Sequence, residues 1–246
     1  MKPHPLPILE TLYKSIAWPW YYRKQLGLAL LPSFLALAGL EFASLYTPMM
    51  NEGKGTWLFA LISLPFGILY IITIHRFLIL GPEATPKFGM FEWRGREWRY
   101  LLYLIGLSIL LGVIAVIPLM ALFSSAAGSG QSAFRTIIML IVCLPALLMF
   151  ARLSLVFPAI AINSNFSLAA VWQAGKGNTF RLAVIVYWMP AGAAILDYFL
   201  PDNLPQYVEA VVILTWVLLS YALWAIEIAC LSFAYKYLAA PTGAAD

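Results

Sequence analysis

Six long apolar segments, joined by short polar connections, dominate the pattern of this chain. Each segment holds about 20 residues with few charges, and a helix that rises 1.5 Å per residue then crosses a hydrocarbon core of about 30 Å. Because lipid offers the backbone no hydrogen-bond partners, such segments predict α-helices. The expected spans cover residues 26–46, 57–80, 101–123, 137–160, 182–200 and 208–231. The pattern therefore predicts an all-α fold, a single polytopic bundle of six transmembrane helices.

Two connections carry a helical pattern of their own. In the N-terminal segment, residues 1–24, apolar side chains recur at helical spacing, and they are Leu6, Leu9, Leu12, Ile16 and Trp20. After the fourth span, Ser167 is an N-cap candidate for a short helix that includes Val171 and Trp172. Both patterns predict amphipathic helices that lie in the membrane interface as elbows between spans.

Composition supports a membrane environment and leaves little material for catalysis. Of the 246 residues, 63% are hydrophobic and 11% are charged, whereas a soluble domain has about 25% charged residues. Cys143 and Cys230 fall inside apolar segments, and His4 and His75 are the only histidines. No catalytic, phosphate-binding or metal-binding motif is present. We therefore expect no enzyme activity, no cofactor and no metal site.

The basic residues are strongly segregated between the two sides of the predicted bundle. All of the 15 Lys and Arg residues except Lys54 and Arg135 fall on the side that holds both chain ends. The positive-inside bias makes that side cytoplasmic, so both termini are expected in the cytoplasm. The net charge of +4 is explained by this topology, and no nucleic-acid partner is needed.

The same side carries the candidate contacts with lipid. Expected headgroup contacts are the basic residues Arg23, Lys24, Arg94, Arg96, Arg99, Lys176 and Arg181. Expected interfacial anchors are the tryptophans Trp18, Trp20, Trp93, Trp98 and Trp172. Indole rings favour the headgroup level because they combine an apolar body with a polar N–H group.

Glu227 is the main candidate for a carboxylate inside a span. Arg76 and Arg152 are expected at a similar depth, near the same ends of their helices, so an ion pair between Glu227 and one of them is a hypothesis. Such a pair fixes the register of two helices, or it forms part of a proton or anion relay. The structural interpretation is favoured, because one pair alone does not make a pathway.

An internal repeat is predicted at an offset of 76 residues. The segment 76–82 aligns with 152–158, each with Arg first and Pro six residues later, and 94–100 aligns with 176–182 through a basic-Gly-x-x-aromatic-Arg pattern. Two copies of a span, an elbow and a returning span predict a parallel repeat. The alternative is that two connections at one membrane surface independently acquired Arg, Pro and aromatic residues.

The second copy of this pattern, over about 35 residues from Ala151 to Leu182, resembles a bacterial membrane family. It is similar to the helical membrane domain attached to some glycerophosphodiester phosphodiesterases and to its free-standing relatives. The resemblance implies a helical fold in a bacterial inner membrane, and it implies no phosphodiesterase activity, because the catalytic domain is not part of this sequence.

Function is expected to follow from membrane contact and not from catalysis. We expect an accessory, scaffold or lipid-interacting component of the bacterial inner membrane, with lipids and other membrane proteins or a second copy as partners. The alternative is a small transporter or lipid-handling permease that works as an oligomer. A continuous polar cavity would favour transport, and a closed apolar core would favour the scaffold.

Overall fold

The structure is a computed structural model that describes residues 5–45, 56–89, 92–124, 132–164, 167–198 and 206–239. All regular elements in these ranges are helices, as the apolar pattern predicted. The long helices are α2 (Arg23–Leu45), α4 (Thr56–Leu80), α5 (Gly95–Ser124), α6 (Ser132–Leu153), α9 (Thr179–Tyr198) and α10 (Gln206–Leu238). The short ones are α1 (Ile8–Tyr21), the 3-10 turn η1 (Pro82–Ala84), α7 (Val156–Ala161) and α8 (Leu168–Ala174).

Five helical segments of the described chain are long and apolar enough to cross a membrane. They are Arg23–Ser44, Trp57–Leu80, Gly95–Ile114, Cys143–Ala161 and Leu214–Leu238. The span expected at 182–200 coincides with α9, a helix that is not among these five. The structure thus confirms an all-helical chain with five helices that fit a membrane, and the sixth crossing stays a prediction.

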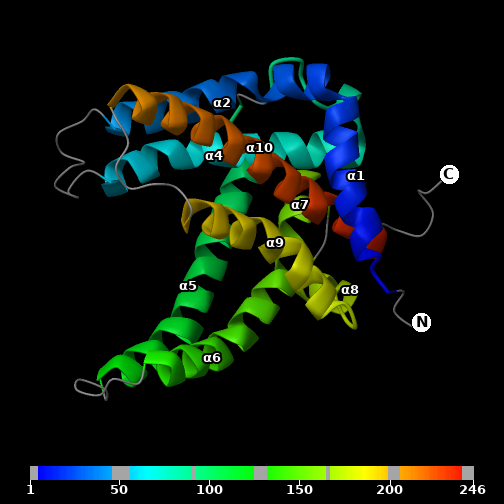
Figure 1. Cartoon of the computed structure of the whole chain (residues 1–246). Helices are drawn as coiled ribbons and strands as arrows, with labels where there is room; N and C mark the ends of the chain where they lie inside the picture. The colour runs from blue at the N-terminus through cyan, green and yellow to red at the C-terminus, as the bar shows by residue number, and fades with distance from the viewer. Residues whose placement is uncertain are drawn as a thin grey trace.

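The long helices follow one another in a continuous row of contacts. α2 packs on α4, α4 on α10, α10 on α9, α9 on α6 and α6 on α5. Figure 1 shows α2, α4 and α10 as one layer, while α5 and α6 form a hairpin that runs away from this layer. Near its first residues α5 returns to contact α4 and α7, so the two parts of the bundle meet at one end.

α7 occupies the place where the parts meet, and all six of its residues are buried. It contacts α4, α5 and α10, and its side chains join the larger of two apolar clusters. The span expected at 137–160 is thus divided between α6 and the buried α7. α6 ends at Leu153, and Pro158 lies inside the first turn of α7, where its missing N–H costs no helical hydrogen bond.

The two connections of the predicted repeat have different local structures. After α4 the chain makes η1 and then an irregular segment, whereas after α6 it makes α7 and α8. Ser167 caps α8 as expected, since its side chain accepts a hydrogen bond from the Ala170 N–H at 3.2 Å. The internal repeat is not confirmed by this comparison and stays a prediction.

α1 forms a helix as predicted, but the residues on its two faces differ from the expectation. Thr11 and Ser15 face the bundle and are buried, and each hydroxyl donates to a backbone carbonyl four residues earlier. Self-satisfied hydroxyls can be buried at little cost, so these small side chains let α1 approach α10 closely. The outward face carries the exposed large apolar side chains Leu9, Tyr13, Ile16, Trp20 and Tyr21.

Candidate functional site

The polar features of the molecule concentrate at one end, which we call the basic end. It comprises α1, the first residues of α2, α5 and α9, the last residues of α4 and α10, η1 with residues 85–89 and 92–94, and α8 with residues 175–178. Of the seven basic residues expected to contact headgroups, five are exposed: Arg23, Lys24, Arg94, Arg99 and Lys176. Arg181 is half-buried, and its guanidinium donates to the Leu6 carbonyl at 3.2 Å. Most of the expected headgroup contacts thus lie on an accessible surface.

The tryptophans of the basic end divide into exposed rings and packed rings. Trp20 and Trp98 are 71% and 56% exposed, and Trp172 is partly exposed. Trp18 instead packs edge to face against Phe77 and Phe233. Trp93 is half-buried against Trp98 and the larger apolar cluster. The exposed rings suit an interfacial belt, while Trp18 acts mainly as a core residue that holds α1 and α2 on α4 and α10.

Arg96 is placed differently from the expectation of a headgroup contact. Its side chain is 6% exposed and forms a salt bridge with Glu97, which is fully buried. The Glu97 carboxylate accepts from the Arg96 Nε at 2.9 Å and, with its other oxygen, from the Arg94 backbone N–H at 2.8 Å. Burial and pairing remove Arg96 from the accessible surface, so Arg96 is not placed to contact a lipid headgroup as expected.

Glu97 is a fully buried, paired carboxylate that was not expected from the sequence. It is the third residue of α5, the position from which a carboxylate reaches back to the N-cap N–H in a capping box. A negative charge there also interacts favourably with the positive end of the helix dipole. The signal was present as a glutamate three residues after Arg94, but the span was expected to begin only at residue 101.

Arg76 reaches from the end of α4 across the place where the layer of α2, α4 and α10 meets the hairpin of α5 and α6. Its guanidinium donates to the Ala161 carbonyl at 3.2 Å and to the Ala84 carbonyl at 3.4 Å. It also interacts electrostatically with the Arg96–Glu97 pair, whereas its Nε is buried without a hydrogen-bond partner among the described residues. Arg76 therefore ties the ends of α7 and η1 to α4 with one side chain.

Arg152, at the end of α6, joins its helix to α8 in a similar way. Its Nε donates to the Trp172 carbonyl at 2.7 Å, and its guanidinium lies 3.8 Å from the centre of the Trp172 ring. Gly175 makes this approach possible, because a Cβ atom there would lie 2.6 Å from the Arg152 Cγ. Contact with an indole face stabilises the cation and fixes α8 against α6.

The structure does not bring Glu227 together with either arginine. Glu227 is half-buried on α10, and no salt bridge joins it to Arg76 or Arg152 in the part of the chain that the structure describes. The arginines satisfy backbone carbonyls of their own connections instead, because α7 and α8 lie closer to them. Another pair does join α4 and α10: the His75 Nδ1 and the Ser232 hydroxyl are 2.7 Å apart.

The N-terminal segment is tied to the start of α9 by two polar contacts. Leu6 donates its N–H to the Asn178 side chain at 2.8 Å and accepts from Arg181 through its carbonyl. On the far side of the basic end, Arg99 donates to the Asn163 side chain at 3.2 Å. These contacts hold the connections in place, so the connections of the basic end form one surface held together by hydrogen bonds.

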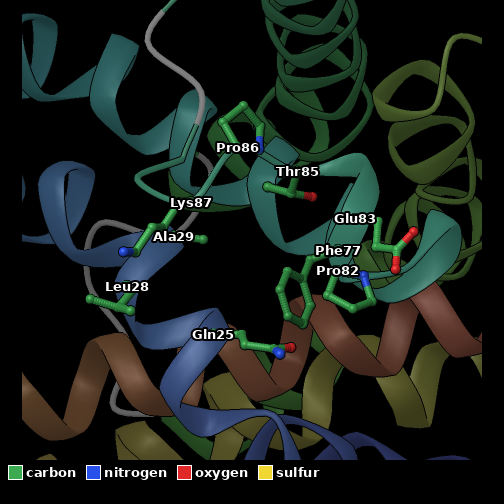
Figure 2. A pocket seen from close by; sticks show the side chains of 9 residues that line it. All are labelled: Gln25, Leu28, Ala29, Phe77, Pro82, Glu83, Thr85, Pro86 and Lys87. Carbon is green, nitrogen blue, oxygen red and sulfur yellow. The ribbon is translucent and has the colours of Figure 1, made fainter.

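A pocket of about 420 Å³ opens in the basic end between α2, the end of α4 and the segment that follows it (Figure 2). Gly89 holds that segment against α2. It has a φ of 77°, and a Cβ atom at this position would lie 2.2 Å from the Ala29 carbonyl oxygen. Only glycine tolerates both the conformation and the contact. The pocket therefore has a wall fixed by backbone packing.

No group of three or more metal-ligating side chains occurs among the described residues. A helical bundle with five span-length apolar helices and a rim of cations and indole rings at one end has the architecture of an integral membrane protein. The chain matches no protein-family model, and no curated protein or solved structure is found to be similar to it.

Proposed function

We propose that this protein is a non-enzymatic, multi-pass component of the bacterial inner membrane that binds lipid headgroups through its basic end and serves as an accessory or scaffold protein. In this proposal the basic end faces the cytoplasm, and both termini lie on that side. The sixth crossing is α9, and the relation to the phosphodiesterase membrane domains concerns the fold alone. Partners are membrane lipids and other membrane proteins or a second copy.

The observation that carries the proposal is the combination of exposed cations and exposed indole rings at one end of an apolar bundle. Lys24 and Lys176 are exposed and form no ion pair with another described residue, so both ammonium groups are available to phosphates. A cation near an anionic leaflet contributes about 1 kcal/mol of binding free energy. Large apolar side chains are exposed along α2, α4, α5 and α10, as lipid contact requires.

The test compares the thermal stability of the purified full chain in detergent with increasing fractions of the anionic lipid phosphatidylglycerol. Ligand that binds the folded state raises the Tm, so we expect the wild type to gain stability with added lipid. The double variant Lys24→Gln/Lys176→Gln should gain less. The matched control is Lys54→Gln/Arg135→Gln, which removes two cations expected on the opposite side, and its Tm gain should equal that of the wild type.

Two results would contradict the proposal. One is an equal lipid-dependent gain in the wild type and in the Lys24→Gln/Lys176→Gln variant, which would place the bound lipid elsewhere. The other is the absence of a lipid effect together with an ion or proton flux in liposomes that Glu227→Gln abolishes. The second result would favour the transporter.

A further inference from the structure

The pocket in the basic end has the size and position of a lipid-headgroup site. Its volume of about 420 Å³ falls in the range of small-molecule pockets, about 300–1,000 Å³. It is lined by side chains from α2, α4, η1 and the following segment, which are Gln25, Leu28, Ala29, Phe77, Pro82, Glu83, Thr85, Pro86 and Lys87 (Figure 2). Three of these elements end or begin here, so the pocket lies at the level where the apolar spans give way to charged residues.

The polarity of the lining changes along α2. Gln25 lies near the start of this helix, and Leu28 and Ala29 follow about one turn later, about 5–6 Å along its axis. Phe77 forms the floor on the α4 side, held by an edge-to-face contact with Trp18. A ligand with a polar head and an apolar body would match this gradient, as a phospholipid does.

The rim carries one charge of each sign, and the Lys87 ammonium group lies 5.5 Å from the centre of the Phe88 ring. Glu83 and Lys87 are exposed, and neither forms an ion pair with another described residue. Figure 2 shows the carboxylate and the ammonium group on opposite sides of the pocket, with Phe77 and Pro82 between them. Their separation leaves two positions of opposite charge for a ligand.

We propose that this pocket binds the zwitterionic headgroup of an aminophospholipid, with phosphoethanolamine as the recognised chemistry. Lys87 and the Gln25 amide contact the phosphate, Glu83 accepts from the primary ammonium group, and the upper acyl chains lie against Leu28 and Phe77. Phe77 is the one aromatic ring in the described lining, whereas a quaternary ammonium group is usually held by several rings. The chemistry thus favours a primary amine over choline.

The pocket is organised before any ligand arrives. The Gly89 contact with Ala29 fixes the segment that carries Lys87, and η1 with its two flanking residues fixes Glu83. In the same wall, the Thr85 hydroxyl is buried and has no hydrogen-bond partner among the described residues. Preorganised walls reduce the conformational entropy lost on binding. The inference rests on the proposed function in one respect, namely that the basic end lies at headgroup level.

The experiment measures the affinity of the full chain in detergent for dihexanoyl-phosphatidylethanolamine and dihexanoyl-phosphatidylglycerol, by titration of the Tm shift. The wild type should prefer the ethanolamine lipid. Glu83→Gln should lower the affinity for that lipid about tenfold, as expected for one hydrogen bond to a charged group, without lowering the affinity for the glycerol lipid. Lys87→Gln should weaken both lipids. The matched control is Glu92→Gln, an exposed carboxylate of the basic end outside the pocket, which should preserve the preference.

A third variant, Leu28→Trp, fills the pocket and should abolish binding of the short-chain ethanolamine lipid while the Tm without lipid reports whether the chain still folds. The inference is overturned if Glu83→Gln keeps the wild-type preference, or if the wild type prefers the glycerol lipid. Either result leaves the proposed function standing when Lys24→Gln/Lys176→Gln still loses its anionic-lipid response. An anionic-lipid response of the double variant equal to that of the wild type would instead remove the proposed function.

Discussion

A fully buried glutamate, Glu97, lies where the hairpin of α5 and α6 meets the layer of α2, α4 and α10. Glu97 satisfies the Arg94 N–H and pairs with Arg96, and Arg76 adds a third charged group nearby. The sequence pointed to Glu227 as the buried carboxylate, with Arg76 or Arg152 as its partner, whereas the structure pairs Glu97 with Arg96. The choice of Glu97 depends on where α5 begins, and hydropathy does not report that, because a helix continues into the headgroup region without apolar residues.

Replacing Glu97 should destabilise the protein more than replacing any exposed carboxylate. Glu97→Gln leaves Arg96 buried without its counter-charge, and breaking such a pair typically costs about 3–5 kcal/mol. Urea or thermal unfolding in detergent measures the loss. Glu92→Gln is the control and should change the free energy of unfolding by less than about 0.5 kcal/mol. If both variants unfold alike, the Arg96–Glu97 pair does not stabilise the junction.

At the scale of elements, the helices themselves were predictable and the exact placement of the short ones was not. Long apolar runs led to correct expectations for α2, α4, α5, α6 and α10, because the mean hydropathy over a window of residues is enough to recognise such helices. The burial of α7 could not be derived, since its sequence is as apolar as a lipid-facing segment. Its contacts with α4, α5 and α10 alone distinguish it.

α1 shows why periodicity did not identify the buried face. Apolar residues occur on most sides of this helix, and the deciding factor is the close approach to α10, which favours Thr11 and Ser15. The larger residues Leu9, Ile16 and Trp20 are left outside. A helix of a soluble protein would point these residues inward, so the arrangement indicates that the outer face of α1 contacts an apolar environment.

Spin labels can test the environment of the α1 outer face. In a background without Cys143 and Cys230, a label on Ile16→Cys in reconstituted membranes should be more accessible to oxygen than to a polar nickel reagent, because oxygen concentrates in lipid. The matched site is Lys14→Cys, which is exposed near Glu10 on the polar side and should show the reverse. Higher accessibility of Ile16 to the nickel reagent would show that α1 faces water.

At the scale of the whole molecule, the distribution of basic residues predicts on which side of the membrane the basic end lies. In the same cysteine-free background, an impermeant thiol reagent should label Gly95→Cys only after the membrane is opened, since Gly95 begins α5 at the basic end. Ser129→Cys, in the connection between α5 and α6 outside the described residues, should react in intact cells. Reversed labelling would place the basic end outside.

The two parts of this bundle diverge, so they cannot both stand upright in one bilayer. The apolar segment of 25 residues in α10 corresponds to about 38 Å along the helix axis. In a hydrocarbon core of about 30 Å, a segment of this length fits only when it is tilted by roughly 35–40°. The divergence between the layer of α2, α4 and α10 and the hairpin of α5 and α6 is therefore coupled to hydrophobic mismatch. A thicker bilayer lets the layer stand more upright, a thinner one makes it lean further, and the angle between the two parts becomes a response to membrane thickness.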